Sequence, residues 1–353
     1  MIKVLYLFNR TKSESVKNVE HGVESDNHFS GMFRLNNFGV SAEHMELEQS
    51  FFAPLAPFLR KHLLNIHFAH IPLFFRIFKY DIVFTSTAFG TLLLKTLLFL
   101  KKPKWVMFDF NIEGMIGDRK KLRQRLFYRM VSKCDGIVTL SYSAAETMRR
   151  MFPLKAKNIK FIPLGTDLSF FKPLTDPEED FIFSPGRDPG RDHKTFLKAV
   201  TDLPITVKVT AKTEHLKKAG ALPTNIQQCD FSHVELCNQY ARAKIIIIPL
   251  DISDTSNDAM GCSTLVEAMA MGKAIIATNT PTMRSYITSG VNGILVPPHD
   301  ADALRKAIEA LLVDSEKRKS LGLAARAFME EHCGADDFAQ KLASFFTIVH
   351  NTH

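Results

Sequence analysis

The residues best suited to chemistry lie in a glycine-containing segment that runs from Gly261 to Gly272. Gly261, Ser263 and Thr264 stand where a loop enters a predicted helix, and Glu267 follows in its first turns. The first backbone N–H groups of a helix have no partner within it and carry its positive dipole, so they can bind phosphate. The Glu267 carboxylate could accept hydrogen bonds from a ribose diol, or it could simply favour the helix dipole.

A second segment concentrates positive charge just after a predicted strand at 181–186. Arg187 and Arg191 precede a predicted helix, and Lys194 lies one turn into it. Guanidinium groups are well suited to binding an anionic ligand. The same arginines could instead be surface residues paired with the neighbouring aspartates. Both interpretations stay open on residue types alone.

The elements that must hold these residues alternate between strands and helices. Short apolar runs bounded by turn residues are typical of buried parallel strands. The predicted strands are 2–8, 81–86, 104–110, 136–141, 159–165, 181–186, 205–210, 244–250, 273–278 and 293–297. Helices are predicted at 118–133 and 144–151 and after Asp300, a plausible N-cap. The alternation predicts an α/β protein with two doubly wound, Rossmann-like domains.

The length and the distribution of charge also indicate two domains. A chain of 353 residues is long enough for both. Residues 1–172 hold 26 Lys and Arg against 14 Asp and Glu, a net charge of +12, whereas residues 173–353 hold 19 against 23, a net charge of −4. We expect a first domain over 1–170 and a second over 171–334. Ligands of open α/β sheets bind beyond the carboxyl ends of the strands, which predicts a central cleft between the two domains.

The composition excludes several other classes of protein. Hydrophobic residues make up 46% and charged residues 23% of the chain, which excludes a disordered or collagen-like protein. There is no run of about 18 apolar residues to predict a transmembrane helix. The opening MIKVLYLFNR predicts a strand rather than a signal peptide. The five cysteines have no metal-ligand spacing and suit free thiols in a reducing cytosol.

Four motifs, in the expected order, resemble the retaining GT-B glycosyltransferases of family 4. The segment GCSTLVEAMAMG resembles the family's L-x-E-A-M-A-x-G donor motif, and SPGRDPGRDHKTFLKA resembles the opening of its second domain. The passage from CDGIVTLS to IKFIPLGTDLSFFKP and the helix ELCNQYARA before KIIIIPL are similar to the family as well. The resemblance implies a nucleotide-diphosphate sugar as donor, and it implies that the helix over 335–353 packs back on the first domain.

The resemblance also implies roles for individual residues. The implied catalytic residues are Asp109, Arg191 and Glu267. The implied donor-binding residues are Gly186, Arg187, Arg191, Lys194, Asp258, Gly261, Cys262, Ser263, Thr264, Leu265 and Glu267. No cofactor or metal is implied. The Asp300-Ala-Asp302 spacing, which binds a metal in another glycosyltransferase fold, is expected to cap a helix here.

The sequence departs from the family pattern at two positions. The family's first motif glutamate falls at Ala259, so either the adjacent Asp258 or backbone N–H groups would contact the donor sugar. Where many members have a histidine after the fourth strand, this chain has Asp109, Asn111 and Glu113. A carboxylate there could bind acceptor hydroxyls or act as a base. Asp109 could equally be a capping residue at a strand end.

Residues 51–104 combine large apolar side chains with positive charge. They contain ten Phe and eight Lys or Arg, but only one acidic residue, Asp81. This composition is typical of a surface that inserts apolar groups among anionic lipid headgroups, and each basic residue adds about 1 kcal/mol to the attraction. The alternative is that the phenylalanines fill a core and the basic residues are solvated. Nucleic acid is not expected as a partner, because there is no nucleic-acid-binding motif.

These features and the family resemblance predict a metal-independent glycosyltransferase that uses a nucleotide-diphosphate sugar, and the resemblance alone implies that it retains the anomeric configuration. Its acceptor would be a glycan or a lipid-linked sugar at the cytoplasmic face of the membrane, in polysaccharide or glycolipid synthesis. A sugar-nucleotide epimerase or a phosphorylase of the same fold is a second hypothesis. A non-catalytic, membrane-associated scaffold is a third, and Ala259 is its best support.

Overall fold

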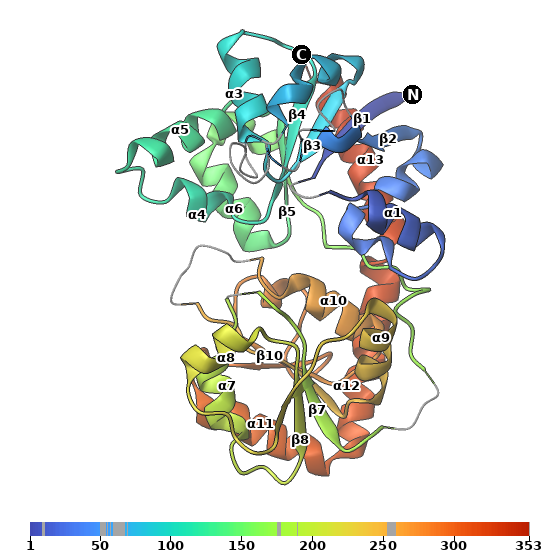
Figure 1. Cartoon of the computed structure of the whole chain (residues 1–353), viewed down its shortest axis with the longest axis vertical. Helices are drawn as coiled ribbons and strands as arrows, with labels where there is room; N and C mark the ends of the chain where they lie inside the picture. The colour runs from blue at the N-terminus through green and yellow to red at the C-terminus, as the bar shows by residue number, and fades with distance from the viewer. Residues whose placement is uncertain are drawn as a thin grey trace. The chain divides into compact units, whose positions relative to one another are not determined.

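The computed structural model describes residues 1–8, 11–49, 54, 56, 58, 68, 70–174, 178–188, 190–252 and 259–352. The chain forms two compact units (Figure 1). Unit 1 comprises Met1–His21, His28–Ile162 and Asp336–His353, and unit 2 comprises Gly22–Asn27 and Pro163–Ala335. The chain thus enters unit 2 at Pro163, before the boundary expected at 170/171. The short segment Gly22–Asn27 belongs to unit 2 although it lies early in the sequence.

Unit 1 is built on a parallel sheet of six strands in the order β2-β1-β3-β4-β5-β6. Its strands are β1 Ile2–Leu7, β2 Val40–His44, β3 Ile82–Thr85, β4 Lys104–Asp109, β5 Gly136–Thr139 and β6 Ile159–Phe161. The inner strands β3 and β5 are buried at every position. Burial on both faces is the reason that their sequences are continuous apolar runs rather than alternating patterns.

Helices cover both faces of the unit 1 sheet. The apolar core on one face joins the sheet to η5 Ile71–Lys79, α3 Phe89–Leu97, α4 Ile112–Ile116, α5 Leu122–Val131 and α6 Tyr142–Met151. The C-terminal helix α13 Ala335–Asn351 packs against the sheet at Gly136, where an added Cβ would lie 2.9 Å from Val349 Cγ2. The remaining elements of this unit are α1 Ser13–Glu20, η1 Asp26–Phe29, η2 Met32–Phe38, η3 Leu47–Gln49 and η6 Pro153–Asn158.

Unit 2 repeats the architecture with six parallel strands in the order β12-β11-β10-β7-β8-β9. Its strands are β7 Phe181–Ser184, β8 Thr206–Val209, β9 Ile226–Gln228, β10 Ile245–Ile248, β11 Ile275–Thr278 and β12 Ile294–Val296. Figure 1 shows α7 His193–Val200, α8 Thr213–Ala219 and α11 Ala301–Val313 on one face. The opposite face carries α9 His233–Arg242, α10 Cys262–Ala270 and α12 Ser315–His332. A short turn, η7, spans Met283–Ser285.

The predicted α/β fold class is confirmed, and the predicted strands form within a few residues of their expected bounds. The Asp300 carboxylate accepts the Ala303 N–H at 2.8 Å, so it caps α11 as predicted. Several elements were not predicted, among them α1, β2, α3, α4, α8, β9 and α12. The described residues of the phenylalanine-rich stretch divide between buried positions such as Phe74 and exposed ones such as Phe75. Residues 51–53, 55, 57, 59–67 and 69 of this stretch lie outside the described part.

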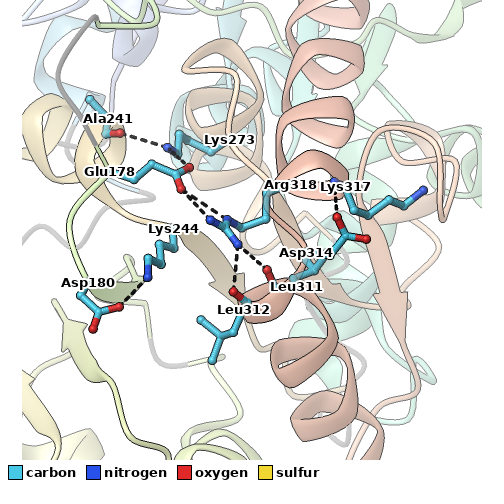
Figure 2. A network of polar contacts seen from close by, with 10 residues as sticks. All are labelled: Glu178, Asp180, Ala241, Lys244, Lys273, Leu311, Leu312, Asp314, Lys317 and Arg318. Atoms are coloured by element: carbon cyan, nitrogen blue, oxygen red, sulfur yellow. Dashed lines mark hydrogen bonds and ion pairs between the residues drawn. The ribbon is translucent and has the colours of Figure 1, made fainter.

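A network of ion pairs between the exposed Glu178 and two buried cations fixes the entry of the chain into the unit 2 sheet (Figure 2). Glu178 accepts from Lys273 Nζ at 3.2 Å and from Arg318 Nη2 at 3.0 Å. Both cations are buried, and burial lowers the pKa of Lys273. Arg318 also donates to the carbonyl of Leu311 at 2.7 Å, and Lys273 to that of Ala241 at 3.0 Å. Glu178 therefore compensates two cations that would otherwise be buried without a counter-charge.

Replacing Glu178 by alanine is expected to lower the free energy of unfolding by about 1–3 kcal/mol, because two desolvated cations lose their carboxylate. The matched control is Asp180→Ala, which breaks the more exposed pair with Lys244 and should cost about 0–1 kcal/mol. Urea unfolding followed by circular dichroism measures both variants. Equal destabilisation by the two changes would contradict this account of the network.

Candidate functional site

The loop after β7 is fastened to the end of β10 by backbone hydrogen bonds. Arg191 and Leu250 form an antiparallel bridge. The Asp192 N–H donates to the Pro249 carbonyl at 3.1 Å, and the Asp251 N–H donates to the Gly190 carbonyl at 2.9 Å. The loop therefore lies at the carboxyl edge of the unit 2 sheet, where open α/β sheets bind ligands.

The Arg191 guanidinium is the most deeply buried cation at this edge. The residue is 5% exposed. Its Nε donates to Asp188 Oδ2 and its Nη2 donates to Thr264 Oγ1, both at 2.9 Å. Its Nη1 is buried and has no hydrogen-bond partner among the described residues. Buried polar groups are nearly always paired, so an open donor on a fixed guanidinium indicates a place for an anionic ligand.

Gly186 makes room for that guanidinium. It has a φ of +125°, and an added Cβ would lie 2.2 Å from Arg191 Nη2. No larger residue fits without moving the arginine. The Gly186 N–H donates to Thr210 Oγ1 at 2.8 Å, which holds the turn in place. Glycine at this position therefore serves the placement of Arg191.

Helix α10 begins beside Arg191. Gly261 precedes it with a φ of +74°, in the left-handed region that favours glycine, and an added Cβ would lie 3.0 Å from Ile248 and Leu250. Cys262 and Leu265 are buried in the core, whereas Ser263 is exposed. The positive end of the α10 dipole and the Arg191 charge thus lie at the same place, and both favour an anion.

Glu267 is buried in the second turn of α10. It accepts a hydrogen bond from the Tyr240 hydroxyl at 3.0 Å and another from Asn27. Burial raises the pKa of Glu267 to about 7, although both hydrogen bonds and the Arg191 charge act in the opposite direction. Above this pH the carboxylate is a strong acceptor that can bind hydroxyl groups.

Sequence reasoning missed three residues of this cluster. Asn27 donates to Thr166 Oγ1 at 2.5 Å and accepts from the Asp167 N–H at 2.9 Å, which places it beside Glu267. No sequence signal links Asn27 to Glu267, because 240 positions separate them. Tyr240 lies in the quoted segment ELCNQYARA, but it has no recognised role there. Burial and the Arg191 charge lower the pKa of His193 to about 4, so this imidazole is neutral at pH 7.

The other predicted donor-site residues are placed differently. Arg187 is exposed and pairs with Asp230 rather than with a neighbouring aspartate. Lys194 is exposed in the first turn of α7. Asp258 lies outside the described residues, and Ala259 falls in the turn before α10. The structure thus brings together Gly186, Arg191, Thr264 and Glu267.

The predicted acceptor residues belong to unit 1. Asp109 ends β4, and its carboxylate accepts the Ile112 N–H at 2.8 Å at the start of α4. This is the capping geometry that we considered as the alternative. Asn111 Oδ1 is buried without a hydrogen-bond partner in the described part of the chain. Glu113 is exposed in α4.

Two family models match consecutive parts of the chain. The model "Glycosyltransferase Family 4" matches residues 38–170, and "Glycosyl transferases group 1" matches residues 166–328. Together with the two parallel sheets, these matches define the class of the protein by its fold, the GT-B glycosyltransferase fold. Within that class the chain resembles glycosyltransferase family 4.

The individual relatives match this chain at low identity or over a small part of its length. A D-inositol 3-phosphate glycosyltransferase of Xylanimonas cellulosilytica is 25% identical over 56% of this chain, and the match spans about half of that relative, 54% of its length. A phosphatidyl-myo-inositol mannosyltransferase of Mycolicibacterium smegmatis is 40% identical over 19% of this chain and 17% of its own. The crystal structure of Anabaena HepE with UDP and glucose has a TM-score of 0.69 at 15% identity, with 98% of this chain and all of that chain covered, which shows a shared fold.

Proposed function

We propose that this protein transfers a hexosyl group from a nucleoside diphosphate sugar to a glycan or lipid-linked acceptor. The observation that carries the proposal is the buried Arg191 guanidinium, with one open donor beside the first turn of α10. A diphosphate supplies anionic oxygens that can accept from this open donor and from the first backbone N–H groups of α10. The named relatives support the proposal, since they include a glycosyltransferase, a mannosyltransferase and a fold relative solved with UDP.

In this proposal each residue of the cluster has a distinct role. Arg191 and the α10 dipole bind the diphosphate and stabilise its negative charge as the glycosidic bond breaks, so no metal ion is needed. Thr264 and Asp188 orient the guanidinium. Glu267 accepts hydrogen bonds from the ribose hydroxyls, and Tyr240 and Asn27 position its carboxylate. Retention of the anomeric configuration is part of the proposal through the family resemblance.

We propose further that the acceptor is bound by unit 1 at a membrane surface on the cytoplasmic side. The net charge of +12 over residues 1–172 supports an anionic surface as the partner. Among the described residues no helix is long and apolar enough to cross a membrane. Asp109, Asn111 and Glu113 stay the proposed contacts of the acceptor hydroxyls, and Asp109 acts in addition as the cap of α4.

The test is a transfer assay with UDP-glucose, GDP-mannose and ADP-glucose as donors and detergent-solubilised polar lipids as acceptor. We expect one donor to give a glycolipid that keeps the anomeric configuration of the donor, as read by proton NMR, with the same rate in EDTA. A converted sugar nucleotide without acceptor would instead indicate an epimerase. Absence of turnover with all three donors, together with no nucleotide binding to folded protein, would favour the scaffold hypothesis.

A further inference from the structure

Unit 1 has an apolar pocket lined by residues of α3 and α5. These two helices pack against each other, and Figure 1 labels both. Its volume is about 340 Å³, and its described lining consists of Phe68, Phe89, Leu93, Arg123, Leu126, Phe127 and Met130. Phe89 and Phe127 form its aromatic wall, with ring centroids 4.8 Å apart. Arg123 is the single charged residue of this lining, and its guanidinium lies 5.3 Å from the centre of the Phe127 ring.

The surface beside the pocket is strongly basic. Residues 119–133 contain seven Lys and Arg and no Asp or Glu. In the described ranges the only ion pair of these seven joins Lys120 to Asp118. On the same helix Leu122 is 83% and Leu126 41% exposed. Helix α5 thus presents large apolar side chains next to positive charges that the described parts of the protein leave uncompensated.

We propose that this pocket takes a hydrocarbon chain of an anionic membrane phospholipid, whose phosphate pairs with Arg123 and the neighbouring basic residues. This inference rests on the proposed function in one respect. The proposed function places unit 1 at a membrane surface, and the inference names α5 as the part of unit 1 that contacts it. Charge complementarity identifies the occupant: an apolar pocket lined by Arg123, on a helix whose other basic residues are exposed, matches a molecule with a hydrocarbon chain and an anionic head. A purely apolar protein segment would leave these cations unpaired.

Co-sedimentation with vesicles tests the surface. Vesicles of phosphatidylglycerol and phosphatidylcholine are compared with vesicles of phosphatidylcholine alone. We expect binding only to the anionic vesicles. Arg123→Gln should weaken it about fivefold, the effect of one charge near such a surface. Leu126→Asp should weaken it further, because it places a carboxylate at the pocket. The matched controls are Lys319→Gln and Val313→Asp, exposed positions of unit 2.

Calorimetry with octyl phosphate, hexyl phosphate and inorganic phosphate tests the pocket itself. We expect octyl phosphate to bind more tightly than hexyl phosphate by about fourfold per methylene group, and inorganic phosphate to bind weakest. Leu126→Asp should remove the dependence on chain length. Equal affinity for the three probes, or vesicle binding by Leu126→Asp equal to that of Val313→Asp, would overturn the proposal. Arg191→Ala should still bind the vesicles. A failure of the proposed transfer reaction can therefore be distinguished from a failure of the proposed lipid site.

Discussion

Replacing Arg191 by alanine is expected to lower kcat/KM for sugar transfer by about 10²–10³, the loss typical of removing one preorganised group that stabilises developing charge. The guanidinium is held by Asp188 and Thr264 and keeps one donor open, so a bound diphosphate would meet a cation that needs no reorganisation. Steady-state kinetics with the donor found active measures the effect. Arg191→Lys should keep part of the activity that Arg191→Ala loses, because lysine supplies the positive charge but not the planar set of guanidinium N–H donors.

Arg187→Ala and Lys194→Ala are the matched controls for this prediction. Both remove a positive charge from the same segment, but both side chains are exposed, and Arg187 already pairs with Asp230. We expect each to lower kcat/KM by less than about tenfold, as for a screened surface charge. The account would be wrong if Arg187→Ala matched Arg191→Ala while the Arg191 variant stayed folded.

Glu267→Gln is expected to weaken nucleotide binding at pH 7.5 by about ten- to hundredfold, since hydrogen bonds to a charged acceptor contribute about 1.5–3 kcal/mol each. The wild-type affinity should also depend on pH. The pKa of Glu267 is about 7 in the folded protein, so the carboxylate is mostly protonated at pH 5.5 and mostly ionised at pH 7.5. Ribose hydroxyls donate to the ionised form, and we expect binding to tighten roughly tenfold over this interval.

Calorimetric titrations of UDP at pH 5.5, 6.5 and 7.5 measure this dependence. The phosphate of UDP also titrates in this pH interval, and it does so equally with both proteins. The titration of Glu267→Gln therefore serves as the control for that contribution. The variant should stay folded at pH 8. A pKa raised on folding means that ionisation of Glu267 costs stability as the pH rises from about 4.5 to about 7, and the neutral amide has no such cost. An identical pH dependence in both proteins would rule out the role given to Glu267.

The sequence was sufficient for most of the fold because the strands that form the core are short apolar runs. The β10 segment, four isoleucines, is buried at every position and was recognised as a strand from composition alone. Strands β2 and β9 were missed since they lie at sheet edges, where exposed polar residues such as Glu43 and Gln227 hide the pattern. Helix α1 has no buried residue and therefore no apolar stripe to detect.

The candidate site was predictable where the sequence itself brings residues together. Arg191 and Glu267 stand in motifs with a recognisable order, and the structure connects them through Thr264. Asn27 was not predictable, because a segment from the first 30 residues joins unit 2 only in the folded chain. The importance of Gly186 could not be predicted either. It becomes visible only in the structure, where a Cβ added at Gly186 would lie 2.2 Å from Arg191 Nη2.

The most direct test of the central claim is a calorimetric titration of UDP, GDP, ADP and CMP into the wild-type protein and Arg191→Ala. We expect one nucleoside diphosphate to bind the wild-type protein and CMP not to bind. The Arg191 variant should lose this binding while it stays folded at the temperature of the titration. The base that binds would also narrow the choice of donor sugar. Failure of all four nucleotides to bind well-folded wild-type protein would contradict the assignment of the Arg191 site as a donor site.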